Sequence, residues 1–312
     1  MSRTVKDFVV IGLKGMAMGA ADVVPGVSGG TIAFISGIYE ELLTSISNIN
    51  LSLLKTLKND GIKAAWKQVN AAFLLALFTG IFVSIVSLAK VIKWLLENEP
   101  ILLWSFFFGL VLASVIYIGK QITKWNFGAI LLMIIGAVLA YYITTLNPLV
   151  SENSSTLFLF IAGAIAICAM ILPGISGAFI LVLLGAYKTL SDTLHNLDIK
   201  NLLIFVLGAA IGLLSFSKLL KWLFSNYRNV TLALLTGFII GSLNKIWPWK
   251  ETLTTRVNSE GINVPVLQQS ILPEKYTELY QTDSQLMFAL ALMLIGFLTI
   301  IILEKLGAKK DI

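Results

Sequence analysis

Two polar segments interrupt apolar stretches of the sequence, and each combines a proline–glycine pair with a serine and a further glycine. They are Val23-Val24-Pro25-Gly26-Val27-Ser28-Gly29-Gly30-Thr31 and Ile171-Leu172-Pro173-Gly174-Ile175-Ser176-Gly177-Ala178-Phe179. Proline lacks a backbone donor and glycine tolerates unusual dihedral angles, so a helix is expected to break in each segment. The helix-breaking residues are Pro25, Gly26, Pro173 and Gly174. Because open backbone at membrane depth is tolerated only against protein or a water-filled cavity, we interpret both segments as tips of re-entrant hairpins that line a ligand site.

A new helix is expected to begin directly after each break, with the serine in the N-cap position. A helix start presents free amide donors and partial positive charge, and glycine lets a ligand approach the backbone closely. Two such starts that enter from opposite membrane faces would form a midplane pocket for phosphate or carboxylate. The predicted anion-binding residues are Ser28, Gly29, Gly30, Thr31, Ser176, Gly177 and Ala178. The alternative is that the breaks only allow the hairpins to pack.

Asp22 stands just before the first break, where the end of a helix already carries partial negative charge. A carboxylate in this position needs a partner or a proton. It could bind H+ or Na+ as a coupling ion, form an ion pair with Lys14, or accept hydrogen bonds from the amides of the tip. The matching position in the second segment is Met170. We therefore expect the first tip to carry more of the polar chemistry.

Four lysines at the ends of two apolar stretches form matching pairs, and each pair stands beside a tryptophan. The lysines are Lys90, Lys93, Lys218 and Lys221. Together with Lys14 they are candidates for basic gates that collect an anionic head group near each membrane surface. The alternative for each lysine is ordinary snorkelling of its ammonium group to the interface.

The composition is that of an integral membrane protein. Of 312 residues, 57% are hydrophobic and 13% are charged, and the mean hydropathy is +0.87. Several separate apolar runs exclude a soluble globular domain. The net charge of +6 comes from basic residues between these runs, where they set orientation, so nucleic-acid binding is not expected. The single cysteine, Cys168, lies in an apolar run, and neither a metal nor a cofactor is expected.

These patterns predict an all-α polytopic fold. Spans are expected at 71–96, 101–119, 127–146, 201–224, 230–247 and 286–303. The runs around the tips are 8–21, 31–38, 157–172 and 178–187. They are shorter than the about 20 residues that a spanning helix needs, which favours re-entrant hairpins. The lysine-rich segment 48–70 is expected to be a connector, and the polar segment 248–285 an extracellular loop or lid.

The sequence contains an internal repeat. Residues 23–46 and 171–194 align at an offset of 148 with eight identities. The following spans align at an offset of 128, which pairs Gly80 with Gly208 and Gly109 with Gly237. Each half, 1–150 and 151–312, thus has one hairpin and three spans, and an odd number of crossings inverts the second half. We expect one membrane transport domain, 1–312, with both termini cytoplasmic by the positive-inside rule.

Some residues near the tips have simpler interpretations. Tyr39 and Tyr187 are expected to be interfacial anchors, and Glu40 and Glu41 to be solvated charges at the interface. The first tip also fits the G-x-S-x-G pattern and is similar to the serine motif of intramembrane rhomboid proteases. A hydrolase would need a base, however, and the single histidine, His195, lies in a polar segment beyond the second hairpin. We expect no enzyme activity.

The longer stretch around the first tip resembles the bacterial polyprenyl-phosphate transporter family. The motif is Gly15-Met16-Ala17-Met18-Gly19-Ala20-Ala21-Asp22-Val23-Val24-Pro25-Gly26-Val27-Ser28-Gly29-Gly30-Thr31, with Leu172-Pro173-Gly174-Ile175-Ser176-Gly177 in the second half. The resemblance implies a flippase in the bacterial plasma membrane that returns undecaprenyl phosphate from the outer to the inner leaflet, for recycling in cell-envelope synthesis. Because no nucleotide-binding motif is present, transport would use an H+ or Na+ gradient or the gradient of the lipid. A transporter or channel for a small soluble anion is the alternative.

Overall fold

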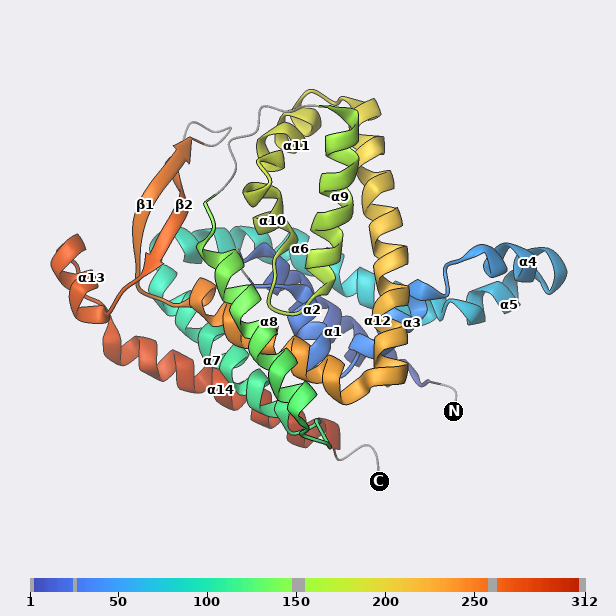
Figure 1. The fold of residues 1–312 in the computed structure, drawn as a ribbon, viewed down its shortest axis with the longest axis horizontal. Coiled ribbons are helices and arrows are strands. Elements are labelled where there is room, and N and C mark those ends of the chain that lie inside the picture. The colour runs from blue at the N-terminus through green and yellow to red at the C-terminus, as the bar shows by residue number, and fades with distance from the viewer. Residues whose placement is uncertain (1–2, 25–26, 148–154, 258–262, 309–312) are drawn as a thin grey trace.

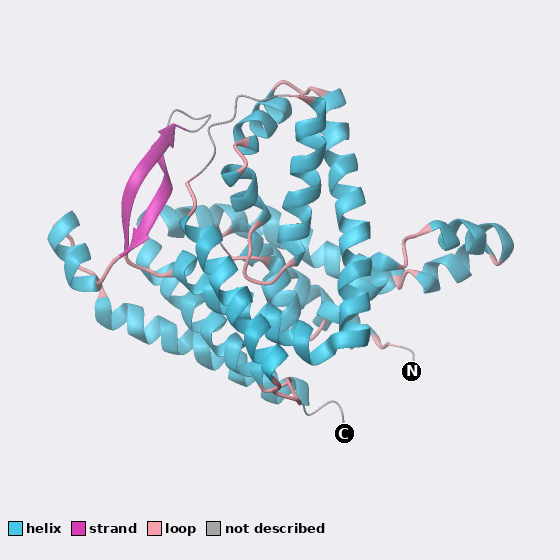
Figure 2. Ribbon diagram, viewed as in Figure 1, coloured by secondary structure: helices cyan, strands magenta, loops and turns pink. Residues whose placement is uncertain are grey.

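The computed structural model describes residues 3–24, 27–147, 155–257 and 263–308 of the chain. This part of the protein is mostly helical, with a single two-stranded sheet at one side (Figure 2). The predicted helix breakers Pro25 and Gly26 lie outside the described residues. The helices on either side of them are described, and they fix where the first tip lies.

The first half of the chain forms two short helices after a long first arm, then a small helical connector, then three long helices. Their bounds are α1 Val5–Val23, α2 Gly29–Ile35, α3 Tyr39–Ser47, α4 Leu51–Asn59, α5 Gly61–Gln68, α6 Ala71–Asn98, α7 Pro100–Gly119 and α8 Phe127–Thr145. Helices α4 and α5 project from the bundle as a hairpin (Figure 1). They correspond to the predicted connector.

The second half begins with a similar series of helices and ends with a polar insertion before the last helix. The elements are α9 Thr156–Ile171, α10 Gly177–Leu183, α11 Ala186–His195, α12 Ile199–Ser242, η1 Leu243–Ile246, β1 Lys250–Val257, β2 Asn263–Ser270, α13 Pro273–Tyr280 and α14 Leu286–Ala308. The predicted span 201–224 and most of the predicted span 230–247 lie in one long helix, α12, which is kinked at Tyr227 (φ −135°, ψ 43°). The kink turns the second part of α12 across the bundle (Figure 1).

Four helices in the described part of the chain are long and apolar enough to cross a membrane, namely α6, α7, α8 and α12. Helices α10 and α11 bend by 108° at their break, and the pair would bring the number to five if it forms one broken span. Helices α9 and α14 are apolar but shorter within the described residues. The chain is therefore a multi-pass helical membrane protein, as its composition predicts.

Glycines let the long helices pack at close range. A Cβ added at Gly80 of α6 would collide with the Gly12 carbonyl of α1, and one at Gly208 of α12 with the Phe160 carbonyl of α9. Two further contacts of the same kind join α7 to α14, through Gly109 and Met293, and α12 to α8, through Gly237 and Met133. Small residues at such positions are typical of membrane helix interfaces. These four helix pairs have the most extensive packing in the molecule.

The insertion between α12 and α14 departs from the all-α prediction. Strands β1 and β2 form an antiparallel hairpin that pairs Lys250 with Ser270, with a register shift near Thr254. Both strands are rich in threonine or valine, whose branched side chains favour strands. The base of the hairpin packs through Trp249 and Ile271 against the starts of α7 and α14. The insertion is thus anchored to the bundle beside the cavity described below.

Candidate functional site

The first tip is closed by its own polar groups. Ser28 is the N-cap of α2, and its Oγ accepts a hydrogen bond of 3.1 Å from the Gly30 amide. The Asp22 carboxylate accepts one of 2.6 Å from the Gly29 amide, and the Thr31 amide donates to the Ser28 carbonyl at 2.9 Å. The first three amides of α2 therefore all have acceptors inside the protein. Ser28, Gly29, Gly30 and Thr31 are also buried.

The same tip covers the end of α9. The last carbonyls of a helix lack partners within the helix. Here the Ser28 hydroxyl donates to the Met170 carbonyl at 2.9 Å, and the Tyr39 hydroxyl donates to the Ile171 carbonyl at 3.1 Å. Tyr39 is only 2% exposed, so the prediction that it is an interfacial anchor is wrong. The tyrosine instead joins the two hairpins.

A third hydroxyl completes the contact between the hairpins. The Thr31 Oγ1 accepts a hydrogen bond of 2.9 Å from the Gly174 amide, and Gly174 has a φ of +88°, which glycine adopts without strain. Gly30 leaves no room for a side chain, because a Cβ would lie 2.5 Å from the Ile171 carbonyl oxygen. We call the three hydroxyl groups the hydroxyl latch: Ser28, Thr31 and Tyr39.

The second tip has the same serine position but different hydrogen bonding. Ser176 is the N-cap of α10, yet its side chain makes no capping hydrogen bond. The first backbone hydrogen bond runs from the Ile180 amide to the Ser176 carbonyl at 3.1 Å. Among the described residues, the amides of Gly177, Ala178 and Phe179 have no acceptor. These donors remain available to an anion.

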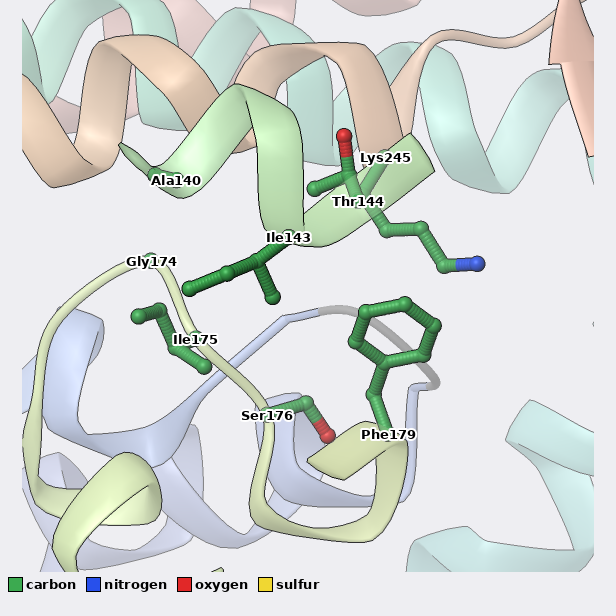
Figure 3. Close-up of a pocket in the computed structure, with 8 residues that line it drawn as sticks. All are labelled: Ala140, Ile143, Thr144, Gly174, Ile175, Ser176, Phe179 and Lys245. Atoms are coloured by element: carbon green, nitrogen blue, oxygen red, sulfur yellow. The ribbon is translucent and has the colours of Figure 1, made fainter. Parts of the chain in front are cut away.

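A small cavity lies beside the second tip (Figure 3). The tip, the end of α8 and η1 line it with Ala140, Ile143, Thr144, Gly174, Ile175, Ser176, Phe179 and Lys245. The Lys245 ammonium lies 4.3 Å from the centre of the Phe179 ring, and no ion pair of Lys245 is found in the described part of the chain. Ser176 and Lys245 therefore line the same cavity, whose volume of about 10 Å³ is that of a single water molecule.

Lys245 is absent from the sites predicted from the sequence. The sequence does indicate Lys245, because it falls within the predicted span 230–247. Placing a charged lysine at membrane depth costs free energy, so such a lysine normally has a function or a partner. Lys250 stands close by: its ammonium donates to the Lys245 carbonyl and lies 4.5 Å from the centre of the Trp104 ring. Burial, and then the neighbouring Lys245 charge, lower the pKa of Lys250 well below its usual range. The lowered pKa favours the neutral form of Lys250, and an anion nearby would favour the charged form instead.

Asp22 and Lys14 contact opposite ends of α2. Asp22 caps the start of α2, which is one of the three predicted interpretations. Lys14 donates to the Ser36 carbonyl at 2.6 Å, at the other end of α2. A role of Asp22 in binding a coupling ion stays a prediction.

The other predicted gate lysines do not gather around the tips. Lys90, Lys93 and Lys218 are exposed on the surfaces of α6 and α12. Lys221 is half-buried, and its ammonium donates to the Asn48 Oδ1 at 3.2 Å.

The prediction of two solvated glutamates after the first hairpin needs correction. Glu40 forms an ion pair of 2.6 Å with Arg228 of α12, and Glu41 forms one of 2.6 Å with Arg3 before α1. Both glutamates are only partly exposed. The sequence order hides these partners, since Arg228 follows Glu40 by 188 residues.

The long apolar helices, together with the bent pair α10 and α11, define the class of the protein as a multi-pass helical membrane protein. Residues 18–264 match the model of the family described as undecaprenyl phosphate translocase-like, and the chain belongs to this family. It is 53% identical over 297 residues to the polyprenyl-phosphate transporter of Vibrio cholerae, covering 95% of this chain and 96% of that one.

A second relative is more distant. The polyprenyl-phosphate transporter of Staphylococcus aureus is 33% identical over 253 residues, which cover 76% of this chain and 85% of the relative. No solved structure matches the chain. Family and relatives agree with the resemblance carried by the first tip: the chain belongs to the undecaprenyl phosphate translocase-like family, and both relatives are named as polyprenyl-phosphate transporters.

Proposed function

We propose that this protein is a flippase that returns undecaprenyl phosphate from the outer to the inner leaflet of the bacterial plasma membrane, where the lipid is reused for cell-envelope precursors. The names of the relatives support the polyprenyl phosphate substrate. The observation that carries the proposal is that Ser176 and Lys245, both of which can bind a phosphate, line one cavity at the second tip. Such groups would select a charged head group over a neutral one. The cavity has a volume of about 10 Å³ in this conformation, so it would have to widen to admit the head group.

The two tips would act in turn. In the described conformation the second tip has open donors, whereas Ser28 and Thr31 of the first tip are engaged in the hydroxyl latch. When the latch opens, the amides of Gly29 and Gly30 would face the lipid phosphate in the same manner. Transport then consists of passing the phosphate from the second tip to the first as access changes from the outer to the inner side.

An inverted repeat would supply the two states. The helix contacts support it, because Gly109 and Gly237, which are 128 positions apart, both pack on the last long helix of the opposite half. We propose one transport domain whose halves are 1–150 and 151–312, with cytoplasmic termini and with 248–285 as a lid on the outer side. The start of α1 and the end of α14 lie on one side of the bundle, away from the β-hairpin (Figure 1).

A vesicle experiment tests the proposal. The protein is reconstituted in vesicles with labelled undecaprenyl phosphate or labelled neutral polyprenol in the outer leaflet, and leaflet exchange is followed with and without H+ or Na+ gradients. We expect rapid exchange of the phosphorylated lipid only. Equal exchange of the two lipids would refute recognition of phosphate at the tips.

The same vesicles distinguish the alternatives. Uptake of inorganic phosphate without lipid exchange would show a transporter for a small anion. Release of free phosphate from the lipid would show a hydrolase. The second outcome is not expected, because the Ser28 hydroxyl is buried and donates to a carbonyl, while His195 is exposed at the end of α11.

A further inference from the structure

A second cavity, which none of the predicted tip residues lines, lies between α3 and the kinked part of α12. It has a volume of about 240 Å³. Five polar or charged residues and two apolar ones line it, namely Glu40, Leu43, Thr44, Lys221, Phe224, Ser225 and Arg228. In the orientation proposed above, this end of α12 faces the cytoplasm.

We propose that this cavity is an inner phosphate site, which receives the head group of the polyprenyl phosphate as it leaves the transport pathway. The inference rests on the proposed function, because it assigns a second position to the same substrate. Lys221 and Arg228 supply two positive charges against the one carboxylate of Glu40, so the empty cavity has a net positive charge. Arginine binds phosphate through two parallel hydrogen bonds, and lysine adds a point charge.

The ion pair in the cavity can give way to a phosphate. Arg228 and Glu40 are 2.6 Å apart, but their side chains are 51% and 45% exposed, and ion pairs that water reaches are weak. Lys221 meets a neutral amide oxygen, that of Asn48, at 3.2 Å. A phosphate that enters the cavity would therefore take the place of the Glu40 carboxylate at Arg228. It would also bind the Lys221 ammonium.

The cavity has apolar as well as charged lining residues, which favours the lipid form of phosphate. Leu43 and Phe224 give it an apolar wall next to the charged groups. Phe224 belongs to α12, one of the helices that are long and apolar enough to cross a membrane. The first isoprene unit of a polyprenyl phosphate would lie against this wall while the phosphate faces Arg228.

The inner site is also connected to the hydroxyl latch. Glu40 follows Tyr39 directly in the first turn of α3, and the Tyr39 ring lies 5.9 Å from the Phe224 ring of the cavity wall. A phosphate that separates Glu40 from Arg228 therefore acts on the same turn that holds Tyr39 to the Ile171 carbonyl. Occupation of the inner site would loosen one hydroxyl of the latch.

Two neighbouring ion pairs provide a matched experiment. The variants Arg228→Gln and Glu40→Gln alter the cavity, whereas Arg3→Gln and Glu41→Gln alter an ion pair of equal length that does not line it. Binding of a fluorescent short-chain polyprenyl phosphate is measured with each purified protein in detergent, with inorganic phosphate and neutral polyprenol as competitors. We expect Arg228→Gln to weaken binding about tenfold and Glu40→Gln to strengthen it by about threefold, with both controls unchanged.

The competitors and a second variant complete the test. Lys221→Gln should weaken binding by about threefold, and it keeps the test valid if Arg228→Gln fails to fold. Binding by the cavity variants that equals the controls, or competition by polyprenol as strong as by inorganic phosphate, would overturn the inner site. If wild-type vesicles still prefer the phosphorylated lipid in that case, the proposed function stands and only the inner site is rejected. If wild-type exchange lacks this preference, the proposed function is rejected itself.

Discussion

The two hairpin tips share proline, glycine, serine and glycine at matching positions, yet one is closed and the other is open. At the first tip Asp22 and Ser28 accept from the amides of α2, while Ser28 and Thr31 reach across to the other hairpin. The second tip has Met170 and Phe179 where the first has Asp22 and Thr31. The side chains of Met170 and Phe179 do not accept hydrogen bonds from the first amides of α10, so these amides have no acceptor in the described part of the protein. We therefore expect the differences between the copies, rather than their shared motif, to decide which tip binds an anion.

The hydroxyl latch also determines how much free energy is needed to open the first tip. A net hydrogen bond in a protein contributes about 1 kcal/mol, so the three hydroxyls of the latch favour the closed first tip by a few kcal/mol at most. A ligand that binds the other state better can overcome a bias of this size. The latch is therefore strong enough to keep one tip closed and weak enough to open in a transport cycle.

The largest effect is expected from filling the space where the hairpins meet. In Gly30→Ala, the new Cβ would lie 2.5 Å from the Ile171 carbonyl and 2.8 Å from the Met170 carbonyl, both backbone atoms that cannot rotate away. We expect loss of transport and destabilisation by about 1–3 kcal/mol, measured by lipid exchange and thermal unfolding. Gly128→Ala is the control, because its Cβ would have ordinary contacts only. A Gly30→Ala protein that behaves like this control would show that the tips are not in contact.

The next effect concerns the open tip. Lys245→Gln removes the ammonium group at the cavity but keeps a long polar side chain. We expect exchange of undecaprenyl phosphate to fall about tenfold, since a hydrogen bond to a charged group contributes about 1.5–3 kcal/mol. Lys218→Gln, an exposed lysine of α12, is the control and should exchange lipid like the wild type. Equal rates for the two variants would remove Lys245 from the site.

A pair of serine variants tests the difference between the tips directly. Ser28→Ala removes the cap of α2 and the partner of the Met170 carbonyl, so we expect a stability loss of about 1 kcal/mol. Ser176 has no capping hydrogen bond, so Ser176→Ala should leave stability unchanged and lower the rate of lipid exchange. Thermal unfolding and vesicle exchange are measured for both. The opposite pattern, with Ser176→Ala less stable than Ser28→Ala, would contradict the assignment of closed and open tips.

Much of the fold could be predicted from the sequence, because lipid imposes simple rules on it. Apolar runs of about 20 residues or more predicted the positions of α6, α7 and α8 to within a few residues. The breaks after α1 and α9 followed from proline and glycine. The β-hairpin was missed because 248–285 was assigned by polarity alone, although the threonines and valines of 250–257 and 263–270 favour strands.

The candidate site was harder to predict, because its key contacts join residues far apart in the chain. Ser28 and Ser176 were placed at N-caps from local patterns, and both are N-caps. Tyr39 meets Ile171 across 132 positions, and Lys245 reaches the Phe179 ring of another helix. Such partners are fixed by helix packing, which one sequence does not specify. Lys245 could have been found, because it is the one lysine of the predicted span 230–247.

The smallest effect on stability, and the sharpest test of the first tip, is expected for Asp22→Asn. Asparagine keeps an acceptor oxygen for the Gly29 amide and is as good a cap as aspartate, so folding should change by less than about 0.5 kcal/mol. The change removes the charge that would bind H+ or Na+. If Asp22 couples transport to an ion, the variant should still exchange undecaprenyl phosphate but no longer respond to the gradient of that ion.

Asp22→Ala separates the two roles, because it removes the cap together with the charge and should lose about 1 kcal/mol of stability. Vesicle exchange with and without each gradient, together with thermal unfolding, gives both quantities for the same proteins. An Asp22→Asn protein that responds to the gradients like the wild type would limit Asp22 to closing the first tip. The asymmetry between the tips would then be one of hydrogen bonding alone, and the driving force for transport would have to come from the lipid gradient or from another ionisable group.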